Sequence, residues 1–78
     1  MIDNYNILLQ FYTHVKYIMT GKQVVKTLQK AGWVIDRKTR HTILKKNSKT
    51  VPVPIHGNKD LPIGTLKSIE HITGVKLT

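Results

Sequence analysis

A stretch of alternating valine and proline in the second half of the chain sets the strongest limit on the fold. Residues 50–55, Thr-Val-Pro-Val-Pro-Ile, place valine and isoleucine on one side of an extended segment and Pro52 and Pro54 on the other. Proline has no amide hydrogen to donate to a neighbouring strand, so a segment with two prolines is excluded from the middle of a sheet. The segment is therefore predicted to be an edge strand.

The first helix is predicted over residues 20–31. Residues 20–23, Thr-Gly-Lys-Gln, fit a capping box, in which the threonine and glutamine side chains each bind the backbone amide of the other residue. The apolar residues that follow at helical spacing are Val24, Val25, Leu28 and Ala31. Gly32 then supplies the left-handed residue that ends many helices.

Two further strands are predicted before the proline-containing strand. Residues 33–37, which begin with Trp33, form the first strand, and residues 41–46 form the second. A charged connection separates them. The polar turn at residues 47–49 then leads into the edge strand.

A second helix is predicted after the loop at residues 57–60. Pro62 suits its first turn, and Gly74 ends it. The apolar side of this helix consists of Ile63, Leu66, Ile69 and Ile72. The expected fold is α+β in the order α-β-β-β-α, a three-stranded antiparallel sheet with both helices on one face. The other face is left exposed and is expected to be polar or functional.

The charge of the chain indicates a polyanionic partner. Lysine and arginine number 13 against 4 Asp and Glu, a net charge of +9. Residues 1–18 hold only Asp3 and Lys16, so the whole excess belongs to residues 19–78. We therefore expect an aromatic-rich extension at 1–18 and a nucleic-acid-binding domain at 19–78. The extension either packs on the domain, mediates self-association, or precedes a natural start at Met19.

Most enzyme chemistries are excluded by the residues that the chain lacks. There is no cysteine, and Ser48 and Ser68 lie in no nucleophile motif. The acidic residues are widely separated, so no metal-binding cluster is expected, and the isolated glycines form no phosphate-binding loop. We expect neither a metal nor another cofactor.

The sequence also predicts a cytoplasmic protein with no membrane contact. No apolar run reaches the roughly 20 residues that a membrane span requires. The stretch before Met19 lacks a positively charged start, and the only alanine is Ala31, so a signal peptide is not expected.

RNA cleavage is compatible with such a chain because the ribose 2′-hydroxyl supplies the nucleophile. The protein then needs only a general acid or base and positive charge to stabilise the transition state. His41 lies among five cations within residues 37–46, although an ordinary exposed histidine explains this pattern as well. His56, after the edge strand, suits either a structural role or a phosphate contact, and His14 and His71 are assigned no function.

Residues 19–78 resemble a HicA toxin along their whole length. The resemblance rests on segments in the same order: residues 20–26 at the first helix, residues 32–34 at the start of the sheet, and residues 51–54 followed by His56. Residues 60–69 complete it, because they match the family pattern L-x-x-G-T-L-x-x-I.

This resemblance implies a fold like that of double-stranded-RNA-binding domains and an mRNA interferase of a type II toxin–antitoxin system, neutralised by a HicB-like antitoxin. It places the catalytic histidine at His41. The family usually has Gly and Ser before this histidine and often a second histidine after it, whereas this chain has Lys-Thr-Arg at residues 38–40 and then Thr42. The residues expected to bind RNA are Lys22, Lys38, Thr39, Arg40, Lys45, Lys46 and His56.

Two other functions fit the same residues less completely. A non-catalytic RNA-binding module with the same fold explains the charge equally well and is the main alternative. The other is a DNA-binding regulator or a ribosome-associated protein, which no helix-turn-helix pattern in the two predicted helices supports.

Overall fold

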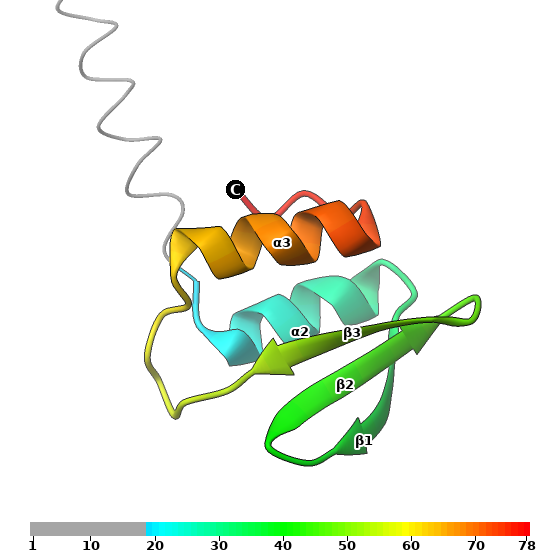
Figure 1. The fold of residues 1–78 in the computed structure, drawn as a ribbon, viewed down its shortest axis with the longest axis horizontal. Helices are drawn as coiled ribbons and strands as arrows, with labels where there is room; N and C mark the ends of the chain where they lie inside the picture. Colours follow the sequence, from blue (N-terminus) through cyan, green and yellow to red (C-terminus); the bar gives the residue numbers. More distant parts are fainter. Residues whose placement is uncertain (1–18) are drawn as a thin grey trace, which may run out of the picture.

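The computed structural model describes residues 19–78, and the predicted extension at residues 1–18 lies outside the described part. Two helices and three strands follow the predicted order α-β-β-β-α (Figure 1). The elements are α2 (Gly21–Lys30), β1 (Val34–Lys38), β2 (His41–Lys46), β3 (Lys49–Pro54) and α3 (Ile63–Thr73). The predicted α+β fold is thus confirmed.

The ends of α2 are fixed by local sequence, as predicted. Thr20 Oγ1 accepts a hydrogen bond from the Gln23 amide at 3.2 Å, and the Thr20 amide donates to Gln23 Oε1 at 2.9 Å, which completes the capping box. At the other end, Gly32 has a φ of +97°, a conformation that glycine adopts without steric cost. The Trp33 amide donates to the Leu28 carbonyl oxygen at 3.0 Å. The Trp33 amide is therefore bonded to the end of the helix, and β1 begins at Val34, one residue later than predicted.

The sheet has the antiparallel order β1-β2-β3, so β3 lies at an edge as its prolines require. Pro54, near the end of β3, lies opposite His41 at the start of β2. The tight turn that joins these two strands contains Asn47 and Ser48, whose φ values of 51° and 71° are those of a type I′ hairpin turn.

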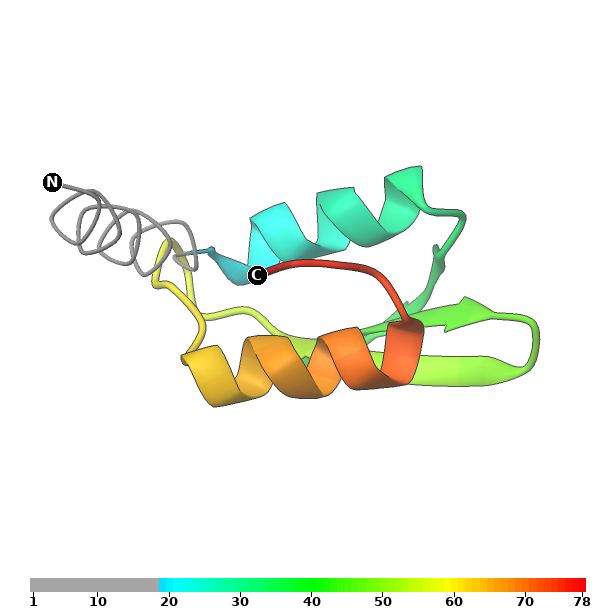
Figure 2. The same cartoon turned by 90° about the horizontal axis from the view of Figure 1, so that it is seen from above.

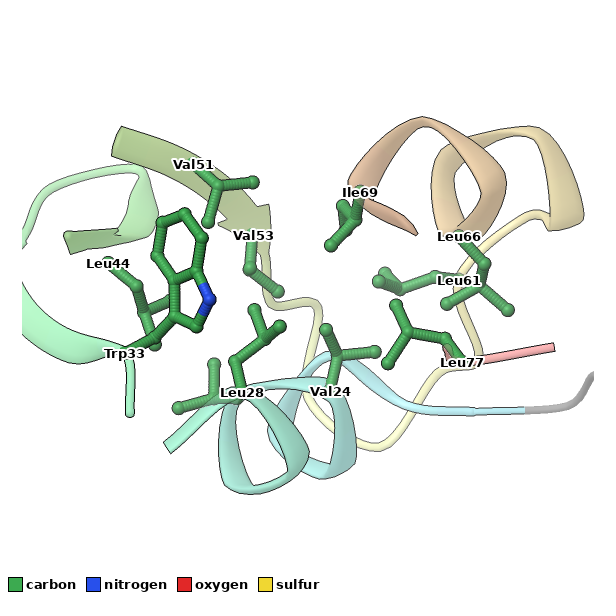
Figure 3. Close-up of a cluster of buried hydrophobic side chains, with 11 residues drawn as sticks. Val24, Leu28, Trp33, Leu44, Val51, Val53, Leu61, Leu66, Ile69 and Leu77 are labelled. Carbon is green, nitrogen blue, oxygen red and sulfur yellow. The ribbon is translucent and has the colours of Figure 1, made fainter. Parts of the chain in front are cut away.

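Both helices pack on the same face of the sheet, as predicted. Leu44 of β2 and Val51 and Val53 of β3 are fully buried on this face. Leu28 of α2 and Leu66 of α3 are equally buried and meet these strands in one cluster (Figure 3). Within residues 19–78, neither helix has the length and hydropathy that a membrane crossing requires.

The tail after α3 turns back between the two helices (Figure 2). Leu77 joins the core cluster, and the half-buried Glu70 holds the tail there. Glu70 Oε2 accepts from the Leu77 and Thr78 amides at 2.6 and 2.8 Å, and Oε1 accepts from Thr78 Oγ1 at 2.8 Å. The amides of Thr78 and Leu77 stabilise the ionised carboxylate and lower the pKa of Glu70 below its ordinary value of 4.5.

Candidate functional site

His41 lies on the side of the sheet that the helices do not cover. It is the first residue of β2, and its side chain is exposed. Side chains alternate along a strand, and Thr42 and Leu44 are buried, so the His41 imidazole is directed to the opposite face. The His41 carbonyl oxygen accepts from the Thr39 amide at 2.9 Å and from the Thr39 hydroxyl at 3.5 Å. The turn therefore holds the backbone of His41 and leaves its ring at the surface.

A basic pocket of about 520 Å³ opens beside His41, between α2 and the turn that joins β1 to β2. Two groups of cations face each other across it. The charged residues of its lining are Lys22 and Lys26 from α2, Lys38 at the end of β1 and Arg40 from the β1–β2 turn. Its apolar lining comes from Val25, Ile35 and Ile55. His41 is also among the lining residues.

The electrostatics of this basic pocket favour a phosphate chain. All of its charged lining is cationic, and the acidic residues of the described part, Asp36, Asp60 and Glu70, lie outside it. The cations are exposed, and opposing walls of one charge sign concentrate anions between them. The pocket therefore suits the backbone of a nucleic acid better than a neutral small molecule.

The α2 wall of the pocket is held in place by a close glycine contact. A Cβ atom on Gly21 would overlap the carbonyl oxygen of Pro54 and lie 2.9 Å from Cγ1 of Ile55. Only glycine lets the first turn of α2 approach the end of β3 this closely. This contact fixes where Lys22, the next residue, stands relative to the start of β2.

The pocket brings together five of the residues that the sequence singled out: Lys22, Lys38, Thr39, Arg40 and His41. Lys45 and Lys46 instead lie at the other end of the sheet, and both line a different hollow with Asp36. Lys46 Nζ donates to the Ala31 carbonyl oxygen at 2.8 Å, so this ammonium closes the C-terminal end of α2. His56 is exposed in the loop after β3 and is not part of the pocket lining.

A comparison with known protein families gives one match. The family model described as the HicA toxin of bacterial toxin–antitoxin systems matches residues 21–75, more than half of the chain. The chain belongs to the HicA toxin family. It is therefore the toxin component of a toxin–antitoxin system. The matched range contains every described helix and strand, including the basic pocket. Neither the curated proteins nor the solved structures gave a match.

Two further residues of this HicA pocket were not singled out from the sequence. Lys26 and Gln29 follow Lys22 at intervals of four and seven residues, so all three lie along one side of α2. This spacing is visible in the sequence. It indicates a shared site only when the opposite side of the helix is recognised as the buried one.

The described part of this HicA toxin offers no metal site. Within residues 19–78, no group of three or more histidine, aspartate or glutamate side chains lies close enough together to hold an ion.

Proposed function

We propose that this toxin is an mRNA interferase, an endoribonuclease that cuts RNA by acid–base catalysis at His41 without a metal ion. The observation that carries the proposal is an exposed histidine, His41, among the lining residues of a pocket whose charged lining is entirely cationic. With mRNA as the substrate, the place of action is the cytoplasm.

The reaction uses the ribose 2′-hydroxyl of the substrate as the nucleophile. The 2′-oxygen bonds to the adjacent phosphorus, the bond from phosphorus to the 5′-oxygen breaks, and a 2′,3′-cyclic phosphate and a 5′-hydroxyl end result. His41 either takes the proton from the 2′-hydroxyl or gives one to the leaving 5′-oxygen, and water serves the other step. Lys38 and Arg40 on the adjacent turn stabilise the extra negative charge of the transition state.

The two walls of the pocket bind the RNA backbone on either side of the cleaved bond. Lys22 and Lys26 stand one helical turn apart on α2. Lys38 at the end of β1 and Arg40 in the β1–β2 turn form the other wall. Cations from two elements contact successive phosphates, which sets the register of the strand without reading its sequence. A HicB-like antitoxin that is acidic at its contact surface neutralises the toxin by covering the same pocket.

A non-catalytic RNA-binding module is the second candidate, and one observation favours it. Within residues 19–78, no side chain forms a hydrogen bond with the His41 ring. Histidines that act as general bases are commonly oriented by a partner on the second ring nitrogen. An RNA-binding module needs no such partner.

The test is His41→Ala, with His71→Ala as the matched control because His71 is an exposed histidine near the end of α3. We expect His41→Ala to lower RNA cleavage by the purified protein at least about 100-fold, since acid–base catalysis contributes that much. Growth arrest on expression should disappear with it, while RNA binding and the thermal unfolding midpoint remain.

Cleavage by His41→Ala at the wild-type rate would refute the role of His41. Wild-type protein that binds RNA but leaves it intact, with and without a chelator, would select the binding module. The chelator arm also checks that no adventitious metal ion accounts for the activity.

A further inference from the structure

His41 also borders a second hollow, on the opposite side from the basic pocket. This hollow has a volume of about 410 Å³ and lies between the proline side of β3 and one side of α3. Its lining includes Pro52 and Pro54 from β3, Thr65, Ser68 and Ile72 from α3, and His41. We name it the proline hollow.

The proline hollow and the basic pocket differ in chemistry. Apart from His41, the hollow is lined by no titratable side chain, whereas the basic pocket is lined by cations. Pro52 and Pro54 provide an apolar surface on β3, and Thr65 and Ser68 on α3 each carry a hydroxyl group. Hydroxyls both donate and accept hydrogen bonds. A flat group with an apolar face and a polar edge can pack against the prolines and form hydrogen bonds with the hydroxyls. A phosphate has no apolar face to pack against the prolines and finds no cationic side chain on either wall.

The α3 wall comes from the segment that carries the L-x-x-G-T-L-x-x-I pattern. Gly64 and Thr65 lie in its first turn, and Ser68 and Ile72 follow at four-residue intervals on the same side. A Cβ atom on Gly64 would meet nothing within 4 Å. The lack of a side chain at Gly64 is therefore not needed for packing in the core, and it leaves the hollow open.

We propose that the proline hollow holds the nucleobase next to the cleaved phosphate and that Thr65 and Ser68 contribute to the sequence preference of cleavage. This inference rests on the proposed RNA substrate. The base lies against the rings of Pro52 and Pro54, and its edge exchanges hydrogen bonds with the two hydroxyls. Single-stranded RNA presents such unstacked bases, and apolar side chains that sandwich a base are a common way to hold it.

The position of His41 between the two hollows fits this assignment. A nucleotide has its phosphate and its base on opposite sides of the ribose, and the 2′-hydroxyl lies between them. With the phosphates among the cations and the base against the prolines, the ribose lies over His41. The reacting hydroxyl then stands beside the only imidazole that lines either hollow.

The test fills the hollow with Gly64→Trp and compares it with Ile63→Trp. Tryptophan is a better helix former than glycine and has open space at position 64. Ile63 is 44% exposed on the same helix and lines neither hollow, so it controls for the added ring. The purified proteins are incubated with a pool of short random-sequence RNAs, and the cleaved ends are sequenced. Circular dichroism melts confirm folding.

We expect Gly64→Trp to slow cleavage about tenfold or more, and Ile63→Trp to keep the wild-type rate and preference. Thr65→Val and Ser68→Ala each remove one hydroxyl, so each should flatten the base preference about three- to tenfold, the usual effect of one lost hydrogen bond. Wild-type rates and an unchanged preference in Gly64→Trp would overturn the assignment. The assignment would also be overturned if these substitutions changed only the neutralisation by the antitoxin, because the hollow would then bind protein and not a base.

An RNA-binding experiment distinguishes failure of the proposed nuclease function from failure of the proposed base site. If the wild-type protein cuts no RNA in the pool, the same variants are compared in selection of bound RNAs from it. A base preference that Gly64→Trp abolishes and Ile63→Trp retains supports the proline hollow without any cleavage. Binding with an identical preference in all variants overturns it.

Discussion

The β1–β2 turn and the β2–β3 turn lie at opposite ends of the sheet (Figure 1). The cations at these two ends are used in opposite ways. Where β1 turns into β2, the side chains of Lys38 and Arg40 are exposed and have no hydrogen-bond or ion-pair partner within residues 19–78. Where β2 turns into β3, Lys46 is half-buried and its ammonium binds the Ala31 carbonyl oxygen. The first end is positioned to attract a ligand, and the second uses its charge to stabilise the fold. Mutations at the two ends should therefore separate binding from stability.

The largest expected effect comes from charge reversal at the first end. Lys38→Glu with Arg40→Glu should weaken the binding of single-stranded RNA about 100-fold at about 0.1 M salt, because two phosphate contacts become repulsions. The matched control is Lys45→Glu with Lys49→Glu, which reverses two exposed lysines away from the basic pocket and changes the net charge equally. Fluorescence anisotropy with labelled RNA in a His41→Ala background measures both. Equal losses would show that overall charge, and not the pocket, governs binding.

Several features of the fold were predictable from the sequence, because each of them is determined by residues close together in the chain. The capping box at Thr20, the helix end at Gly32 and the edge strand at Pro52 and Pro54 each depend on a few neighbouring residues, and all three are confirmed. The basic pocket depends on segments separated by more than ten residues, since Lys26 faces Arg40 only after α2 packs on the sheet.

The difference between Lys45 and Lys46 shows why the rest was harder to predict. Adjacent residues of a strand point to opposite faces, and here Lys45 is exposed whereas the half-buried Lys46 binds the end of α2. The sequence grouped both with His41 because it gives charge but not direction. The partner of Lys46, the Ala31 carbonyl oxygen, is 15 residues away in the chain. Such a contact becomes visible only in the folded molecule.

The next effect concerns the carboxylate that fastens the C-terminal tail. Glu70→Gln should lower the free energy of unfolding at pH 7 by about 2 kcal/mol, because charge-assisted hydrogen bonds to Leu77 and Thr78 weaken. RNA binding should stay unchanged, since Glu70 lines neither the basic pocket nor the proline hollow. Urea denaturation with tryptophan fluorescence measures the stability.

The pH dependence of the same variant follows from the lowered pKa of Glu70. A group whose pKa is lower in the folded state stabilises the fold fully above its unfolded pKa, near 4.5, and loses this contribution as pH falls through the folded value. The stability difference between wild type and Glu70→Gln should therefore be constant above about pH 5.5 and shrink below about 4.5. A difference independent of pH would mean that the carboxylate charge is not what holds the tail.

A smaller loss of stability is expected from Lys46→Met at the second end of the sheet. Methionine keeps the apolar stem that packs near Gly32 but removes the ammonium from the C-terminal end of α2. We expect a loss of about 1 kcal/mol in the free energy of unfolding, with RNA affinity within about twofold of wild type. A large loss of affinity with unchanged stability would place Lys46 in the RNA site instead.

The smallest effect tests whether the second end has a purely structural role. Ser48 has a φ of 71° in the β2–β3 turn, a conformation in which a serine side chain is strained and glycine is not. Ser48→Gly should therefore raise the free energy of unfolding by about 0.5 kcal/mol, because relief of strain slightly exceeds the entropy that glycine adds to the unfolded chain. Cleavage and RNA affinity should not change. Since the turn is remote from His41, a change in either would show that the two ends of the sheet are coupled and that the separation of binding from stability is incomplete.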